Sequence, residues 1–125
     1  MIKGIGTDIL NTKHISGEYL KAGDPFLVKT YSPKEIEEAE QRELPFYYYA
    51  TRFAGKEAVF KSLGLSPQHV LMSEIEILND SFGAPHVTLY GRLKQQARQK
   101  GISTIHISLS YEADYASAFA VAESE

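Results

Sequence analysis

Two segments that lie far apart in the sequence hold the side chains best suited to chemistry. Residues 4–9 read Gly-Ile-Gly-Thr-Asp-Ile, and residues 52–64 read Arg-Phe-Ala-Gly-Lys-Glu-Ala-Val-Phe-Lys-Ser-Leu-Gly. Each segment places one carboxylate, that of Asp8 or Glu57, among apolar and glycine neighbours, where an ionised acid is costly unless positive charge lies beside it. A divalent cation bound between them would stabilise both acids. Asp8 and Glu57 are therefore candidate metal ligands.

Cationic side chains accompany Glu57, because Arg52, Lys56 and Lys61 belong to the same segment. Magnesium bridges carboxylates and phosphate oxygens, while lysine and arginine neutralise the charge that remains. This combination favours a ligand that bears phosphate groups. A simpler interpretation stays open, because Glu57 and Lys61 have the i,i+4 spacing of a helix ion pair worth about 0.3 to 0.5 kcal/mol. A lone aspartate such as Asp8 is also typical of turns and caps.

A third candidate is the polar face of residues 105–110, on which His106, Ser108 and Ser110 alternate with apolar side chains. Hydroxyl and imidazole groups can all donate hydrogen bonds to an anion. A histidine in a strand is more often structural, so that interpretation stays open as well. A serine hydrolase is excluded, because the Gly-x-Ser-x-Gly elbow is absent and i,i+2 neighbours in a strand do not meet productively.

Composition limits the classes of protein to consider. The chain has 125 residues, the size of one ordinary domain, and we expect a single domain over residues 1–125. It has no cysteine, which excludes thiolate metal sites, disulfides and a cysteine nucleophile and suits a reducing cytoplasm. The net charge of -3 argues against nucleic acid as a partner. No segment approaches the roughly 20 apolar residues that span a bilayer, so we expect a soluble, cytoplasmic protein.

Hydrophobic periodicity and capping signals predict the elements that position these groups. The expected helices cover residues 13–22, 33–44, 46–63 and 91–100. The expected strands cover residues 2–10, 70–79, 86–90, 105–110 and a last segment that ends at residue 121. Ser32, Pro33 and Glu35 form a capping box ahead of the second helix. The fold class is α+β, with a mostly antiparallel sheet packed on a long central helix.

Glycines indicate where elements approach each other closely. Gly4 and Gly6 share a strand face with Asp8, and glycine within a strand often marks the approach of another backbone or a ligand. The helix at residues 46–63 is apolar over most of its circumference, which is typical of a buried central helix. Gly55 costs this helix about 1 kcal/mol relative to alanine, so it indicates a close packing contact.

Taken together, these motifs resemble those of the 4′-phosphopantetheinyl transferases. The matching segments are Gly-Ile-Gly-Thr-Asp-Ile at residues 4–9, Arg-Phe-Ala-Gly-Lys-Glu-Ala at 52–58 with Lys61, and His-Ile-Ser-Leu-Ser at 106–110. The chain is more similar still to the short, single-repeat bacterial group, the holo-acyl-carrier-protein synthases, and the resemblance covers essentially its whole length. It implies a magnesium-dependent transfer of 4′-phosphopantetheine from coenzyme A to a serine hydroxyl of an apo acyl carrier protein, with release of adenosine 3′,5′-bisphosphate.

The resemblance also implies roles for individual residues. Asp8 and Glu57 match the magnesium ligands, and Glu57 and Lys61 are the expected catalytic residues. Arg52, Lys56 and Lys61 match positions along the coenzyme A phosphates, with Lys61 at the pyrophosphate. The remaining positions that match contacts to coenzyme A are Gly83, Pro85, His106 and Ser108.

The same resemblance implies a homotrimer whose active sites lie between protomers. The loop Gly83-Ala84-Pro85 would come from a neighbouring subunit. The serine nucleophile arrives on the carrier, so the enzyme needs none of its own. The proton acceptor stays open among Glu57, a water on the metal and Glu35, which the capping box explains more simply.

Three positions depart from the family pattern. Ala84 replaces the lysine usual in its loop, Tyr111 stands where many relatives have a second histidine, and His14 stands where an arginine often helps to dock the carrier. The carrier proteins of this chemistry are acidic, so a basic surface should dock them. The candidates for that surface are Lys13, His14, Lys21 and Lys29, and the nearby Glu18 and Asp24 dilute their charge.

Two alternatives to this function remain. The first is a module that binds coenzyme A or the carrier but has lost turnover through Ala84 and Tyr111. The second keeps the chemistry but transfers to a carrier of polyketide or peptide synthesis rather than fatty-acid synthesis.

Overall fold

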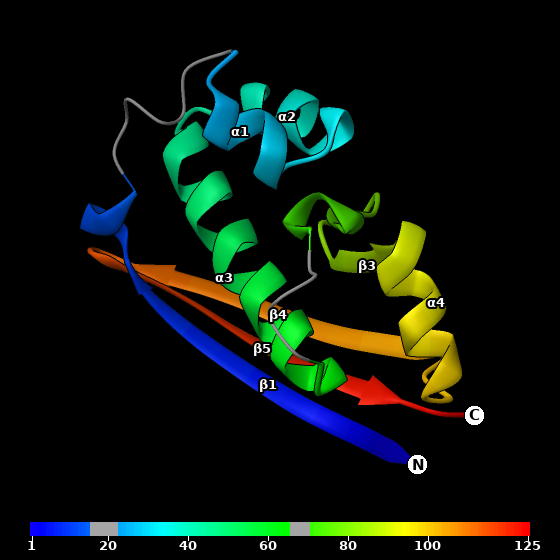
Figure 1. Cartoon of the computed structure of the whole chain (residues 1–125). Coiled ribbons are helices and arrows are strands. Elements are labelled where there is room, and N and C mark those ends of the chain that lie inside the picture. Colours follow the sequence, from blue (N-terminus) through cyan, green and yellow to red (C-terminus); the bar gives the residue numbers. More distant parts are fainter. Residues whose placement is uncertain (16–22, 66–70) are drawn as a thin grey trace.

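A computed structural model describes residues 1–15, 23–65 and 71–125. The long helix α3 (Pro45–Leu63) crosses the middle of the molecule, and the strands lie against it in two antiparallel sheets (Figure 1). The larger sheet has the order β1-β5-β4, in which β1 is Ile2–Asn11, β5 is Tyr115–Glu123 and β4 is Thr104–Glu112. The smaller sheet is a hairpin of β2 (Ile75–Asn79) and β3 (Pro85–Leu89). The predicted α+β fold with a long central helix is confirmed.

Helix α3 begins and ends where the sequence predicts. Pro45 occupies its first turn, where the missing N–H costs nothing, and Gly64 closes it in the left-handed conformation, with φ 64°. Most of its side chains are buried, including its alanines Ala50, Ala54 and Ala58. The prediction of a buried central helix that is apolar over most of its circumference is therefore confirmed.

The larger sheet packs its small side chains against α3. Alternate alanines of β5, from Ala116 to Ala122, are buried on the helix side. On the neighbouring β1, a Cβ added at Gly4 would overlap the carbonyl of Ser62, and one at Gly6 would overlap the carbonyl of Ala58. The backbones of β1 and α3 thus lie closer together than any other residue type allows, as the glycine pattern predicted.

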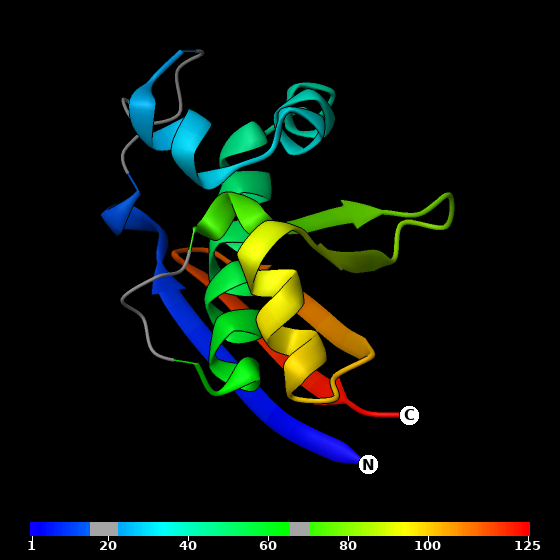
Figure 2. The same cartoon turned by 45° about the vertical axis from the view of Figure 1, so that its right-hand side comes forward.

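Four short elements surround α3, with α1 and α2 near its beginning and α4 beside its second half, while the β2-β3 hairpin projects to the side (Figure 2). They are α1 (Pro25–Thr30), α2 (Pro33–Glu40), the 3-10 turn η4 (Met72–Glu74) and α4 (Gly91–Gln99). The capping box at the start of α2 is confirmed, because the Ser32 hydroxyl accepts from the Glu35 N–H and the Glu35 carboxylate accepts from the Ser32 N–H. No membrane-crossing helix is found within the described ranges, since none is both long and apolar enough.

Several predicted boundaries were wrong. Thr12–His14 form the 3-10 turn η1 rather than the start of a helix, and residues 16–22 of that prediction lie outside the described residues. Helix α1 was not predicted. Helix α2 ends at Glu40 and not near Leu44. The strand expected from residue 70 begins only at Ile75.

Candidate active site

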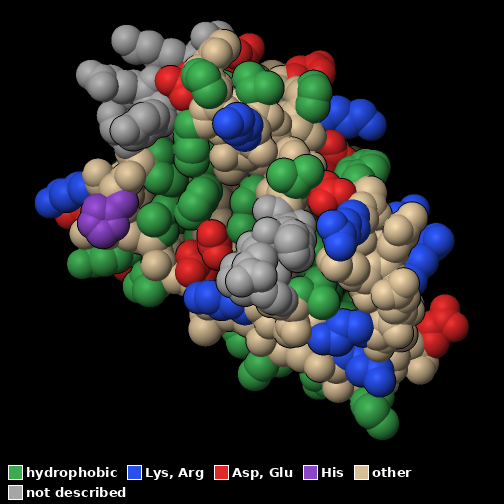
Figure 3. Space-filling model, viewed as in Figure 1, with side chains coloured by type: hydrophobic (Ala, Val, Ile, Leu, Met, Phe, Trp, Pro, Cys, Tyr) green, Lys and Arg blue, Asp and Glu red, His purple; other side chains and the backbone are tan. Residues whose placement is uncertain are grey.

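The structure brings Asp8, Glu57 and Lys61 together where β1 crosses α3. The Lys61 Nζ lies 3.1 Å from the Asp8 Oδ1 and donates a second hydrogen bond, of 3.0 Å, to the Thr7 carbonyl. Asp8 and Glu57 are half-buried, whereas the Lys61 side chain is 52% exposed. Figure 3 shows acidic and basic side chains side by side near the middle of this face.

The glycines of β1 explain why these side chains meet. Asp8 lies on the same strand face as Gly4 and Gly6, so it points toward the helix that those glycines allow to approach. Glu57 and Lys61 are one helical turn apart on α3 and flank the point of contact. The alternating pattern that suggested a close contact therefore positions the acid of β1 against the acid of the helix.

The electrostatics of this cluster favour a bound cation. Partial burial raises the pKa of the Glu57 carboxyl, the charge of Asp8 raises it further, and Lys61 opposes both effects. Within the described residues, Lys61 pairs with Asp8, and the Glu57 carboxylate has no hydrogen-bond or ion-pair partner. A simple i,i+4 ion pair between Glu57 and Lys61 therefore does not account for Glu57.

Asp8 and Glu57 together supply two carboxylates as possible metal ligands. No group of three or more His, Cys, Asp or Glu side chains that could hold an ion occurs in the part of the chain that the structure describes. Magnesium typically binds one or two carboxylates, keeps several waters and contacts substrate phosphates. Asp8 and Glu57 fit that requirement, with Lys61 beside them as a fixed cation.

Lys56 does not join this cluster, and its role along the coenzyme A phosphates stays a prediction. Its ammonium lies in the interior, where neither it nor the Glu35 side chain is exposed. The Lys56 Nζ lies 2.7 Å from the Glu35 Oε1 and also donates to the carbonyls of Met72 and Ile75. Its three N–H groups are thus used, and none is left for a ligand. The Met72 carbonyl belongs to the 3-10 turn η4, in a segment predicted to be a strand.

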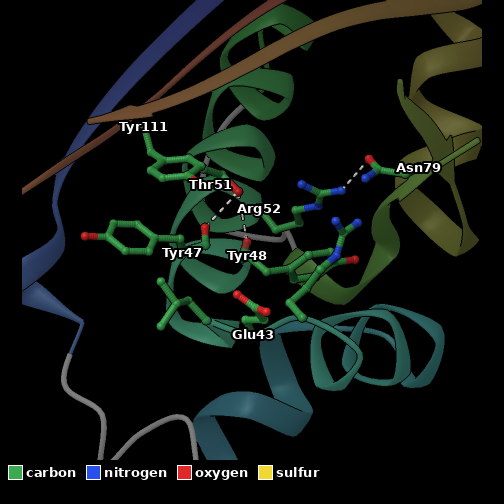
Figure 4. A pocket seen from close by; sticks show the side chains of 9 residues that line it. Glu43, Tyr47, Tyr48, Thr51, Arg52, Asn79 and Tyr111 are labelled. Atoms are coloured by element: carbon green, nitrogen blue, oxygen red, sulfur yellow. Dashed lines mark hydrogen bonds between the residues drawn. The ribbon is translucent and has the colours of Figure 1, made fainter. Parts of the chain in front are cut away.

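Arg52 lines two adjoining clefts on another side of α3. One has a volume of about 360 Å³ and the other about 160 Å³, and both also include Thr51, Asn79 and Tyr111 in their walls. The predicted residues Gly83 and Pro85 line the smaller cleft, at the end of the β2-β3 hairpin. The Arg52 guanidinium is 2.6 Å from the Asn79 Oδ1 and stacks 4.1 Å from the centre of the Tyr48 ring (Figure 4).

Aromatic residues form a wall of the larger cleft that sequence reasoning missed. The rings of Tyr47 and Tyr111 stack with their centres 4.6 Å apart, and Figure 4 shows them side by side at its edge. Burial raises the pKa of the neighbouring Tyr48 hydroxyl, so that this group stays neutral. The only sequence signal for this wall is the run of three tyrosines at positions 47–49, which is equally typical of a core helix.

The third predicted motif lies on the opposite face of the larger sheet. His106 and Ser108 alternate with the inward-facing residues of β4, so their side chains point away from α3. The His106 Nε2 is 3.0 Å from a Glu123 carboxylate oxygen on the neighbouring strand. One copy of the chain therefore does not bring His106 or Ser108 to Asp8, and neither cleft beside Arg52 is lined by the residues of the acidic cluster.

Comparison with known proteins assigns the family. A half-buried carboxylate pair beside a lysine is a suitable site for a transfer reaction at phosphorus. The family model of the 4′-phosphopantetheinyl transferase superfamily matches residues 4–120. The chain therefore belongs to this superfamily of transferase enzymes.

Individual relatives match this chain over almost their whole length. The chain is 43% identical to the holo-acyl-carrier-protein synthase of Wolbachia sp. subsp. Drosophila simulans, over 97% of this chain and 98% of the relative. The crystal structure of the Neisseria meningitidis synthase superposes with a TM-score of 0.87 at 38% identity, covering 98% and 99% of the two chains. The Helicobacter pylori synthase in complex with coenzyme A superposes with a TM-score of 0.80 at 28% identity, covering 95% and 99%.

Proposed function

We propose that this chain transfers the 4′-phosphopantetheine group of coenzyme A to a serine hydroxyl of an apo acyl carrier protein and releases adenosine 3′,5′-bisphosphate. The observation that carries this proposal is the meeting of Asp8, Glu57 and Lys61 at the contact of β1 with α3. The relatives named as holo-acyl-carrier-protein synthases, one of them in complex with coenzyme A, support the same substrates.

Asp8 and Glu57 are the residues that would hold Mg²⁺. When bound, the ion supplies positive charge to the pyrophosphate oxygens on which negative charge builds during transfer. Lys61 contributes a cation whose position is set in advance by Asp8 and by the Thr7 carbonyl. The carrier supplies the attacking hydroxyl, and the unpaired carboxylate of Glu57 is a candidate to receive its proton. Glu35 is not a candidate, because it is buried and engaged by three donors.

The nucleotide end of coenzyme A fits the clefts around Arg52. The Arg52 guanidinium, which also lies 3.6 Å from the Glu38 carboxylate, supplies positive charge to both clefts, and the stack of Tyr47 on Tyr111 offers a flat apolar wall for a base. Gly83 and Pro85 line the smaller cleft, and Ala84 between them contributes no cation. We assign these residues, together with His106 and Ser108, to coenzyme A binding, with each active site shared between two copies of the chain.

Exposed apolar side chains support the proposed homotrimer. On the outer face of the larger sheet, Ile5 is 62% exposed, Ile9 is 70% exposed and Phe119 is 48% exposed. At the tip of the β2-β3 hairpin, Phe82 is 95% exposed. Large apolar side chains exposed in this way are typical of association sites. A neighbour on the outer face of the larger sheet would cover Ile5, Ile9 and Phe119 and would approach His106 and Ser108, which lie on the same face.

The proposed carrier surface stays a prediction. Lys13 lies 3.9 Å from the Asp114 carboxylate, which offsets part of its charge, and Lys21 lies outside the described residues. His14 and Lys29 are exposed and available to an acidic partner. Cytoplasmic location likewise stays a prediction from the sequence.

The test is mass spectrometry of an apo acyl carrier protein incubated with this protein, coenzyme A and Mg²⁺. A mass increase on the carrier equal to one 4′-phosphopantetheine group is expected, and its loss in a carrier whose acceptor serine is replaced by alanine is the control. Carriers of fatty-acid, polyketide and peptide synthesis are compared in parallel to identify the client. Binding of coenzyme A without modification of any carrier would favour the non-catalytic module.

A further inference from the structure

The buried pair Glu35–Lys56 joins four parts of the molecule. The Glu35 carboxylate accepts from the Ser32 N–H at 2.8 Å, from the Lys56 ammonium at 2.7 Å and from the Ile77 N–H at 2.9 Å. The Lys56 ammonium in turn binds the Met72 carbonyl at 3.1 Å and that of Ile75. Helix α2, helix α3, the turn η4 and strand β2 are therefore joined at one buried ion pair.

Stability alone does not explain such a pair. Removing two ions from water costs roughly as much as their attraction returns, and replacing a buried pair with apolar residues of similar volume is often neutral or stabilising. A polar pair that binds three backbone groups from two neighbouring segments instead specifies one arrangement of those segments. A functional side chain that these segments hold would then depend on the pair for its position.

The hydrogen bonds lead from the pair to Arg52. Ile77 donates its N–H to Glu35, and its carbonyl accepts from the Arg52 Nε at 3.4 Å. Two residues along β2, the Asn79 side chain accepts from an Arg52 Nη at 2.6 Å. The Glu35 carboxylate and the Arg52 guanidinium thus both bind Ile77, side by side on the edge of β2 that faces away from β3.

We propose that Glu35 and Lys56 are positioning residues for coenzyme A binding: they fix β2 so that Arg52 faces the nucleotide end of the substrate. This proposal rests on the function proposed above for the clefts. The acidic cluster is held separately, through the contact of β1 with α3. Loss of the pair therefore weakens coenzyme A binding and leaves the rate of the bound complex largely unchanged.

The experiment compares two uncharged double variants. Glu35→Gln/Lys56→Met keeps a carbonyl oxygen for the Ile77 N–H, whereas Glu35→Leu/Lys56→Met removes it. Isothermal titration with coenzyme A measures Kd, and steady-state kinetics measure KM and kcat. For the leucine variant we expect Kd and KM to rise about tenfold, the size of couplings transmitted through packed networks. Its kcat is expected to stay within about twofold of the parent value. The glutamine variant loses the Lys56 bonds but keeps the acceptor for Ile77, so its Kd and KM are expected to rise clearly less than those of the leucine variant. Glu37→Gln, an exposed acid of the same helix, is the matched control.

Equal affinity of the two double variants for coenzyme A would overturn the proposal, because the acceptor for the Ile77 N–H would then have no effect on binding. This holds whether both variants bind like the parent or both bind weakly. If the leucine variant does not fold, the cycle of Glu35→Gln/Lys56→Met, Arg52→Lys and their combination replaces it. Losses smaller than additive support the coupling, and additive losses refute it. Failure of the parent protein to bind coenzyme A would instead refute the proposed function, so the two failures are distinguishable.

Discussion

Helix α3 carries two lysine–carboxylate pairs that differ in burial and in hydrogen bonding. Lys56 lies 2.7 Å from Glu35 with neither side chain exposed, while Lys61 lies 3.1 Å from Asp8 with 52% and 18% of the two side chains exposed. The ammonium of Lys56 is fully used by protein oxygens. Beside Lys61, the Glu57 carboxylate has no partner in the described part of the chain.

The difference shows how the same two residue types serve two purposes on one helix. A pair whose donors and acceptors are all satisfied by the fold has no capacity for a ligand, so it specifies structure. Where an unpaired, half-buried acid lies beside the pair, the oxygens of that acid remain able to bind a ligand. Its negative charge also carries an electrostatic cost that a bound cation would remove. The available hydrogen-bonding capacity, rather than the residue types, separates the structural pair from the site.

The largest expected effect is loss of transfer when the acids of the site are neutralised. Asp8→Asn and Glu57→Gln remove the carboxylates that would hold Mg²⁺, so we expect the rate of carrier modification to fall by about 10²- to 10³-fold. The measurement is the mass of the carrier over time, with circular dichroism to establish that the variants fold. Glu40→Gln, an exposed acid on α2, is the control. Normal turnover of either site variant would remove the basis of the proposed site.

Exchange of each lysine for methionine tests the comparison directly. Lys56→Met leaves the buried Glu35 without its counter-ion, and we expect the free energy of unfolding to fall by about 3 to 5 kcal/mol. Lys61→Met removes an exposed pair and should cost about 1 kcal/mol or less in stability while reducing transfer. Urea denaturation measures the first quantity and the carrier assay the second. Equal destabilisation by the two substitutions would contradict the division into a structural and a functional pair.

A smaller effect is expected where β1 meets α3. Gly6→Ala places a methyl group against the carbonyl of Ala58, so the strand must move away from the helix. We expect a loss of about 1 to 3 kcal/mol of stability and a reduced transfer rate, because Asp8 moves with the strand. Gly23→Ala is a useful comparison, because nothing lies within 4 Å of the added Cβ, although its φ of 85° adds local strain. Transfer by Gly6→Ala at the parent rate would show that the site tolerates this displacement.

The smallest expected effect is on the pH dependence of stability. Because the folded state raises the pKa of Glu57, its contribution to stability is fully present below the ordinary pKa of 4.5 and is lost as the pH rises through the raised value. Metal-free Glu57→Gln should therefore be more stable than the parent at neutral pH, by on the order of 0.5 kcal/mol, because the group is partly exposed. The difference should shrink toward zero in acid. Thermal melts from pH 4 to 8 in chelator measure it, and a stability difference that grows in acid would contradict the assignment.

Much of the local structure was predictable because it depends on neighbours in the sequence. The capping box of Ser32 and Glu35, the terminal glycine Gly64 and the alternation of β4 are set by a few adjacent residues, and the structure confirms each. The ends of weakly patterned elements were not predictable, because tertiary contacts decide them. The carbonyls that Lys56 binds at Met72 and Ile75 are one example.

The sequence by itself determined that Asp8 lies on the glycine face of a strand and that Glu57 and Lys61 lie one turn apart on a helix, because backbone periodicity sets both. Only the tertiary structure decided that Lys56 belongs to the interior. An apolar helix has no distinct solvent face, so periodicity could not say which of its charged residues would meet a buried partner. That partner, Glu35, comes from another helix, and its capping role alone did not reveal that its carboxylate also binds Lys56 and Ile77.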